Sequence, residues 1–566
     1  RPPRSTLFPY TTLFRSYIYH FRALPDDQSF TDPSFIATHG AQWGLNGATW
    51  NIGASAAWDI TTGSSEVIVG VIDTGIRATH EDLENRVDVG LSRDFTQSNP
   101  DGHTPVDNNG HGTRVAGIIG AQGNNGLGIS GVAQNVTLVQ LRVSMSGYSG
   151  AGGVQIANAI DYATGTFQTD RPISILNFSG GSANESDDVR QALLLYPGLF
   201  VSAADNANLD HDTSLDYPTE YSRDPAFTRN NIIAVSSLNW EGNKPTARAY
   251  GQTSVTIFAP GEDILSTHSA SNTAYIRGSG TSFATPHVVG VAALMLSINP
   301  SLTPSQIKEI LIDTATPVAA LNTLCVAGGR LNALTAVRYA QRMSAPSLFI
   351  NTEHNILNQY QNGIKEFRVN AYSSGFYKFT LDASRTDSSP VTYLEGAITI
   401  VAMNGNPLNK YGSDEYLKDS SNDSQSNNVT VFFPSGSYSI TINLADVDSS
   451  ELNYLSLNIS STGYNPSNID VFDDVTLSNL LLTFINDGGV GDSIKQVNLK
   501  QSGKFTIDYN VDVNMVTSAK YFILQRDSSY FDSGFSVLRS GSFNSSFSDT
   551  LDLDQGSYYI GYFDND

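Results

Sequence analysis

The 566-residue chain has a single cysteine, Cys325, so no disulfide can form within it. It is also poor in basic residues, with 32 Lys and Arg against 55 Asp and Glu and a formal net charge of −23. Repulsion from phosphates therefore disfavours a nucleic-acid partner or an anionic membrane. No run approaches 18 consecutive apolar residues, so we expect no transmembrane segment. Stability must then come from packing or from a bound metal.

The length favours two to four domains, because single hydrophobic cores rarely grow beyond about 250 to 300 residues. Residues 1–16 are excluded from this count. Their stretch TLFPYTTLFRS is what a common sequencing adapter gives when translated, so we interpret them as an artefact. At the other end the sequence stops inside a strand pattern, which suggests that the last domain is truncated.

Between residues 25 and 342, short apolar runs alternate with amphipathic helical patterns. The apolar runs are typical of buried parallel strands and cover residues 66–73, 136–143, 173–179, 199–204 and 231–237. The helical patterns cover residues 152–163, 186–196 and 281–297. This alternation predicts an α/β fold with a doubly wound, mostly parallel sheet. Thr303, Pro304 and Gln306 form a capping-box pattern, which predicts a further helix start.

After Arg342 the chain becomes rich in Ser, Asn, Asp and aromatic residues with an alternation of period two. The alternation predicts strands, and the segment pair IKEFRV and SGSYSITI is echoed later by IKQVNL and QGSYYIGY. We therefore expect two all-β sandwich modules, at residues 345–462 and 470–566.

Two motifs in the α/β part contain residues suited to proton transfer. VIDTG places Asp73 at the end of an apolar run, with Gly75 allowing a tight turn. Alone it is ambiguous, because DTG also suits an aspartic protease and a strand-end Asp often only caps a turn. NNGHGTRVAG places His111 between two glycines ahead of a helical pattern. A histidine at a helix start is often only a surface residue, but flanking glycines let the backbone approach a ligand.

A third motif, GSGTSFATPH, brings Ser282 to the start of the long apolar helix. Helix N-termini carry unpaired N–H groups and a partial positive charge, which stabilise an oxyanion forming beside the serine. A serine there can also be an ordinary N-cap, although an N-cap alone does not require the rest of the motif.

The order of Asp73, His111 and Ser282 within these three motifs resembles the subtilisin-like serine peptidases, over about residues 25–341. No second DTG-like site is found, which argues against an aspartic protease. The resemblance implies that Ser282 attacks the scissile carbonyl, that His111 transfers its proton and that Asp73 stabilises the imidazolium. It also implies that Asn206, in the segment AADN, donates a hydrogen bond to the oxyanion.

The same resemblance assigns residues to the substrate cleft. Ser179, Gly180 and Gly181 match the segment that pairs with an extended substrate, although the start of this segment is also a buried strand. Asp205 stands where the family usually has a glycine, at the wall of the primary specificity pocket. Two alternatives remain open there: the carboxylate favours basic side chains, or it points to solvent without effect.

Calcium is the cofactor that the resemblance implies. Asp82, and Asn125 in the loop GNNGLGISG, match positions where relatives hold calcium, and carboxylate and amide oxygens are suitable ligands. Both residue types are also ordinary in turns. A structural calcium site is therefore an expectation that depends on the resemblance.

By the same resemblance, residues 17–24 are the end of a propeptide and residues 25–342 the peptidase domain. The expected protein is a secreted, monomeric zymogen that acts on proteins or peptides, binds its own propeptide and has a signal peptide missing from this sequence. The β modules resemble prepeptidase C-terminal domains. Two alternatives stay open: a surface protein with a weak protease domain, and a maturation protease that cuts one precursor.

Overall fold

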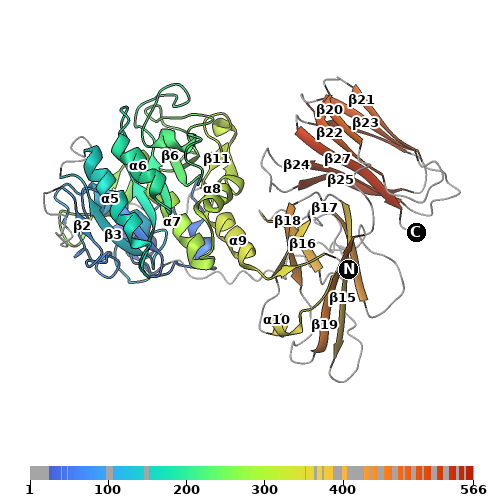
Figure 1. Ribbon diagram of the computed structural model, residues 1–566, viewed down its shortest axis with the longest axis horizontal. Coiled ribbons are helices and arrows are strands. Elements are labelled where there is room, and N and C mark those ends of the chain that lie inside the picture. Colours follow the sequence, from blue (N-terminus) through green and yellow to red (C-terminus); the bar gives the residue numbers. More distant parts are fainter. Residues whose placement is uncertain are drawn as a thin grey trace, which may run out of the picture. The chain divides into compact units, whose positions relative to one another are not determined.

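The computed structural model describes residues 25–39, 41–46, 49–96, 106–145 and 152–350, and thereafter residues 352–361, 366–371, 375–385, 398–403 and the strands named below. The segments 1–16 and 17–24 lie outside the described residues. The chain divides at Val337/Arg338 into two compact units, and each is considered by itself (Figure 1).

A nine-stranded sheet organises the first unit, in the order β10-β11-β7-β6-β5-β4-β1-β3-β2. Its strands are β1 (Ile68–Asp73), β2 (Arg93–Asp94), β3 (Thr137–Arg142), β4 (Ile173–Phe178), β5 (Leu199–Ala203), β6 (Ile232–Leu238), β7 (Ile257–Pro260), β10 (Thr316–Pro317) and β11 (Gly329–Arg330). Every described pairing in this sheet is parallel except β10 with β11. All five predicted strands are present, which confirms the mostly parallel α/β fold.

Helices cover both faces of this sheet. Helices α5 (Gly153–Thr166) and α6 (Asp187–Leu195) lie side by side and form one apolar cluster with alternate strand residues such as Ile68 and Ile72. Val69 and Val71 are equally buried but point to the opposite face, because successive strand side chains alternate. On that second face α4 (His111–Gly120) and α7 (Thr281–Ile298) lie against each other, and α7 packs against β4 to β7.

Shorter elements complete the first unit. They are α1 (Gln28–Thr31), α2 (Pro33–His39), α3 (Ala54–Trp58), α8 (Pro304–Asp313), the 3-10 helices η2 (Thr219–Ser222) and η3 (Ala319–Leu321), and a hairpin of β8 (Ile264–His268) and β9 (Ala274–Gly278). Helix α9 (Ala333–Ser344) contains the division between the two units. The capping box is confirmed: the Thr303 hydroxyl accepts from the Gln306 N–H, and the Thr303 N–H donates to Gln306 Oε1 at 2.9 Å.

Among the described helices, α7 alone is long and apolar enough to cross a membrane by length and composition. However, 78% of its apolar stretch is buried inside the protein. Burial of this kind is typical of a core helix that packs against a sheet.

The second unit is built mainly from strands, which follow α9 in the chain. Two four-stranded sheets contain β12 (Ser347–Leu348), β13 (Thr352–Asn355), β14 (Glu366–Ala371), β15 (Gly375–Arg385), β16 (Ile398–Ala402), β17 (Ser426–Phe433), β18 (Gly436–Ile442) and β19 (Leu452–Ser461), with the short α10 (Leu357–Gln361) after β13. Alternate residues of both sheets are buried, as in Phe367 and Val369 or Phe379 and Leu381. This alternation gives each sheet one apolar face.

The remaining strands form a five-stranded and a three-stranded sheet. They are β20 (Asp470–Val475), β21 (Asn479–Ile485), β22 (Ser493–Leu499), β23 (Gly503–Asn510), β24 (Ala519–Arg526), β25 (Phe535–Phe543), β26 (Phe547–Leu553) and β27 (Gly556–Asp564). The repeated segments take equivalent roles, because IKEFRV and SGSYSITI pair antiparallel as β14 and β18, and IKQVNL and QGSYYIGY pair antiparallel as β22 and β27.

Candidate active site

The first two motifs meet where β1 ends and α4 begins. Asp73 is the last residue of β1 and is fully buried, and His111 is the first residue of α4. His111 Nδ1 lies 2.9 Å from Asp73 Oδ1 and 3.0 Å from Oδ2. Burial alone would lower the pKa of His111, but the charge of Asp73 and its hydrogen bond outweigh burial, so the pKa is raised. The pair therefore favours a proton on the imidazole.

Two glycines make this approach of backbone segments possible. A Cβ on Gly112 would lie 2.1 Å from the carbonyl oxygen of Gly75 and 3.1 Å from Asp73 Oδ1. Gly75 itself has a φ of +123°, and a Cβ there would strike the carbonyl oxygen of Val106. Side chains at either position would push β1 and α4 apart, which explains the glycines in both motifs.

A carboxylate that sequence reasoning missed holds the same junction. Asp107 is buried, and its Oδ1 accepts from the Thr74 hydroxyl and from the Gly110 N–H, while its Oδ2 accepts from the N–H and hydroxyl of Thr113. Asp107 thus joins the residue after Asp73 to the turn that leads into α4. Its only sequence signal is its position four residues before His111.

The third motif places Ser282 in the first turn of α7, where the sequence predicted it. Pro286 lies four residues later and lacks an N–H, so the Ser282 carbonyl cannot accept the usual helical hydrogen bond. The Ser179 hydroxyl donates to that carbonyl instead, at 3.0 Å, and the Ser282 hydroxyl donates to the Ser179 carbonyl at 3.0 Å. This reciprocal pair fixes the start of α7 against the end of β4.

His111 lies next to the same helix turn, since its ring meets the ring of Phe283 edge-on, with centroids 6.2 Å apart. The structure therefore brings Asp73, His111 and Ser282 together from β1, α4 and α7.

Asn206 follows β5 and has a fixed orientation. Its Oδ1 accepts from the Thr281 N–H at 3.0 Å, so the amide end that carries Nδ2 is turned away from the α7 backbone. Asn206 and Ser282 line one pocket of about 360 Å³. The arrangement puts an amide donor beside the serine at a helix N-terminus.

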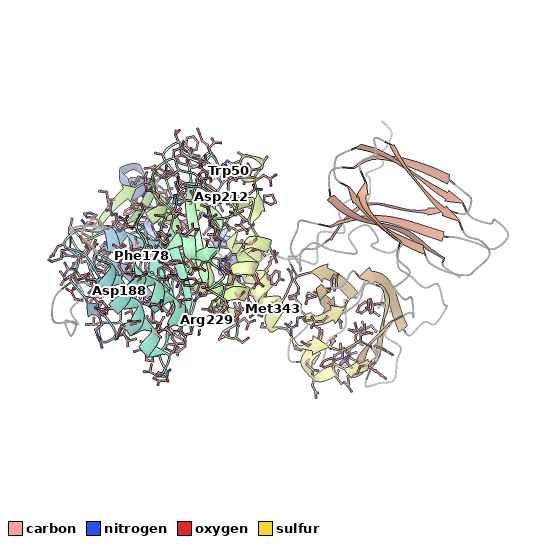
Figure 2. All side chains as sticks on the ribbon, turned by 45° about the horizontal axis from the view of Figure 1, so that its top comes forward. Trp50, Phe178, Asp188, Asp212, Arg229 and Met343 are labelled. Carbon is pink, nitrogen blue, oxygen red and sulfur yellow. The ribbon has the colours of Figure 1, made fainter. Side chains whose placement is uncertain are left out.

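The same pocket contains the residues expected in the substrate cleft. Ser179, Gly180, Gly181 and Asp205 all line it, together with Asp216, which sequence reasoning missed. Gly181 also borders a second hollow of about 550 Å³, which is lined by apolar residues such as Ile156, Phe178 and Val189 (Figure 2 labels Phe178). A cleft segment that borders two hollows is suited to an extended peptide.

The expected calcium ligands lie together. Asn125 Nδ2 donates to Asp82 Oδ1 at 3.0 Å, and the Ile129 N–H donates to Asp82 Oδ2 at 2.9 Å. A second carboxylate that sequence reasoning missed, Asp27, is fully buried beside them and accepts from the N–H groups of Asn124 and Asn125. Burial raises the pKa of Asp27 to about 7 and that of Asp82 to about 6.

Among the described residues, no Lys, Arg or His forms an ion pair with Asp27 or Asp82. The described part of the chain also contains no group of three or more His, Cys, Asp or Glu side chains that could hold a metal ion. A cation at this place would thus be held by two carboxylates supplemented by neutral oxygens.

Comparison with known proteins agrees with this geometry. Residues 64–336 match the Subtilase family, Peptidase S8. Thermitase of Thermoactinomyces vulgaris is 36% identical over 291 residues, which are 51% of this chain and 94% of thermitase. Subtilisin Savinase of Lederbergia lenta is 35% identical over 300 residues, which are 52% of this chain and 98% of Savinase. The chain belongs to the subtilase family of serine proteases.

Among solved structures, a protease from Pseudoalteromonas arctica is 28% identical, with a TM-score of 0.46, and the match covers 56% of this chain and 100% of that one.

Proposed function

We propose that this subtilase is a secreted endopeptidase that hydrolyses peptide bonds through an acyl-enzyme on Ser282. The observation that carries the proposal is the convergence of the buried Asp73–His111 pair with Ser282, which lines a pocket at the N-terminus of a buried helix. Asp73 accepts from Nδ1–H of His111, and this tautomer leaves Nε2 as the proton acceptor.

The reaction begins with a rotation of the Ser282 side chain. Its hydroxyl turns from the Ser179 carbonyl toward His111 Nε2, which takes the proton as Oγ attacks the scissile carbonyl. His111 then returns the proton to the leaving amine. In the second stage water attacks the acyl group, His111 takes the proton of this water, and the proton returns to Ser282 Oγ as the acid product leaves. Asp73 stays ionised and stabilises the imidazolium in both stages.

Two donors stabilise the tetrahedral oxyanion in this proposal. One is the Ser282 N–H in the first turn of α7, where the helix leaves backbone donors unpaired. The other is Asn206 Nδ2, whose orientation depends on the hydrogen bond between Asn206 Oδ1 and Thr281. The substrate lies as an added strand along Ser179, Gly180 and Gly181.

Replacing Asn206 with Ala should lower kcat about 100- to 1000-fold while KM changes little, because the donor acts mainly on the charge that forms in the transition state. Steady-state hydrolysis of a peptide anilide measures both constants. Asn208→Ala, an exposed amide two residues away, is the matched control. A rise in KM alone would instead assign Asn206 to ground-state binding.

An acyl-enzyme predicts a burst when the full chain is mixed with a p-nitrophenyl ester. The expected burst is one nitrophenolate per active chain, followed by slower turnover, because acylation by a good leaving group outruns deacylation. Stopped-flow absorbance measures the burst. A linear time course from an enzyme that cleaves the ester would contradict the covalent mechanism.

We further propose that Asp27, Asp82 and Asn125 hold a structural calcium ion. The support is the burial of two carboxylates without a cationic partner among the described residues, next to the side-chain amide of Asn125, whose Nδ2 donates to Asp82. Calcium prefers such hard oxygen ligands. When bound, it would supply the positive charge that this cluster lacks.

Calcium binding should release protons in a pH-dependent way, because the ion needs both carboxylates ionised. With pKa values of about 7 for Asp27 and about 6 for Asp82, binding at pH 6.5 should release about one proton and at pH 8.5 almost none. Calorimetry in buffers of different ionisation enthalpy measures this number. Asp27→Asn should remove most of the release, and Asp32→Asn, on a partly exposed residue of the same segment, should leave it unchanged.

The remaining proposals follow from family membership. Residues 17–24 would end a propeptide that folds and caps the enzyme, and the monomeric chain would act on protein substrates outside the cell. The peptidase domain would cover residues 25–342. The β modules at 345–462 and 470–566 would act as attachment or spacer domains.

A further inference from the structure

The pocket beside Ser282 has an acidic wall made by two carboxylates from different loops. Asp205 follows β5, and Asp216 lies in the segment before η2. We propose that this pocket takes a cationic side chain and that Asp216 is a specificity-determining residue, which directs cleavage after Arg or Lys. This inference rests on the proposed function of Ser282 and adds the class of substrate.

Asp216 has one oxygen that is already bound and one that is not. The residue is only 5% exposed. Its Oδ2 accepts from the Thr219 hydroxyl at 2.8 Å. Its Oδ1 accepts no hydrogen bond from the described residues and lies against Gly181, where an added Cβ would be 2.6 Å away. Since Gly181 and Asp216 both line the pocket, Oδ1 is the oxygen available to an occupant.

The segment that carries Asp216 is fixed to the cleft strand. The Ser182 N–H donates to the Tyr217 carbonyl at 2.8 Å, and the Tyr217 N–H donates to the Ser182 carbonyl at 2.7 Å. This two-bond bridge lies directly next to both Gly181 and Asp216. The carboxylate therefore has a set position relative to the backbone that would hold the substrate.

The neighbouring groups leave the pocket negative. His211 Nδ1 is 4.0 Å from Asp216 Oδ2, but burial lowers the pKa of His211, so the ring is neutral near pH 7. Arg223 is already paired with Glu220, since its Nε lies 2.9 Å from Glu220 Oε1. Asp205 adds a second negative charge. Of the described groups that face Asp216, none supplies a compensating positive charge.

A buried, half-satisfied carboxylate is unfavourable until a cation pairs with it. A guanidinium or ammonium group supplies both the charge and the missing donor, and a pocket of about 360 Å³ has room for either side chain. A neutral side chain would instead leave Oδ1 desolvated without a partner. The pocket thus discriminates by the penalty on the wrong substrate as well as by attraction to the right one.

The discrimination should depend on pH. Burial, with the charges of Asp205 and Glu220, raises the pKa of Asp216 to about 7. Below this value the carboxyl group is mostly neutral, and above it the charge that attracts a basic side chain is present. Preference for Arg over a neutral residue should therefore rise as the pH increases through about 7.

The first experiment measures kcat/KM for two peptides that differ only in Arg or norleucine before the cleaved bond. Protonation of His111 lowers kcat/KM for both peptides equally, so it cancels in their ratio. The ratio therefore depends on the ionisation of the pocket in the free enzyme. We expect Arg to be favoured at least 10-fold at pH 8.5. Asp216→Asn should lower the ratio at least 10-fold and flatten its pH dependence.

Asp205→Asn separates the two carboxylates and should reduce the ratio less than Asp216→Asn does. Asp188→Asn, which removes one exposed charge from the first turn of α6 (Figure 2), is the matched control and should leave the ratio unchanged. A wild-type preference for norleucine, or a ratio that Asp216→Asn does not alter, would overturn the inference.

A second measurement does not require catalysis. Benzamidine, a cation, and benzamide, its neutral isostere, are titrated into the Ser282→Ala full chain by calorimetry. Benzamidine should bind at least 10-fold more tightly at pH 8.5, and the difference should shrink at pH 6. Equal binding of the two compounds would overturn the inference of a cation-selective pocket, even if Ser282 proves to be the nucleophile. Tighter binding of benzamidine would support the inference, even if the proposed reaction fails.

Discussion

Replacing Ser282 with Ala should reduce peptide hydrolysis by about a millionfold in kcat, an order of magnitude taken from subtilisin itself. The nucleophile is the one atom of the site for which no neighbour can substitute. Ser179, another hydroxyl of the same pocket, is already engaged as a donor to the Ser282 carbonyl. Active-site titration corrects the wild-type rate for inactive protein, and the concentration of folded Ser282→Ala is taken from its absorbance.

The control for this variant is Ser179→Ala. This change removes the other hydroxyl of the reciprocal pair but keeps the nucleophile. It therefore tests whether the rate falls merely because the connection between β4 and α7 is weakened. We expect Ser179→Ala to retain measurable activity, within about 100-fold of the wild type. Equal losses in both variants would contradict the assignment of Ser282.

Replacing Asp73 with Asn should lower kcat about 10,000-fold, the order known for the corresponding change in another serine protease. The amide can donate to Nδ1, which favours the tautomer with its proton on Nε2, and that tautomer cannot accept from Ser282. Because Asp73 is fully buried and near 3 Å from His111, solvent cannot take over its role.

The pH profile separates this electrostatic role from simple misfolding. In the wild type, the charge of Asp73 raises the pKa of His111, so kcat/KM should fall as the pH drops below a midpoint that lies above the ordinary value of an imidazole. Without that charge, burial dominates and the midpoint should move to lower pH. A residual activity with an unshifted midpoint would mean that another group sets the acid limb.

The strands and the three motifs could be predicted because their signals are local. The apolar run at 66–73 ends in a carboxylate, and Ser282 opens an apolar helix, so a short window of sequence contains both the element and the reactive residue. Asn206 and Asp205 were found through the resemblance, since AADN has no periodicity of its own.

The missed residues act across long sequence separations. Asp27 meets Asp82 and Asn125 only after folding, from 55 and 98 positions away in the numbering. Asp216 reaches the pocket of Ser282 through a bridge to Ser182 that no local pattern encodes. In loops, Asp most often serves as a turn residue, so its type alone could not single these positions out.

The most direct test of the central claim is the reaction of the folded full chain with a fluorophosphonate, followed by peptide mapping. We predict one adduct, on the peptide that contains Ser282, formed more slowly as the pH falls and His111 becomes protonated. An adduct on a different residue, or none from protein whose folding is verified by circular dichroism, would contradict the proposed mechanism.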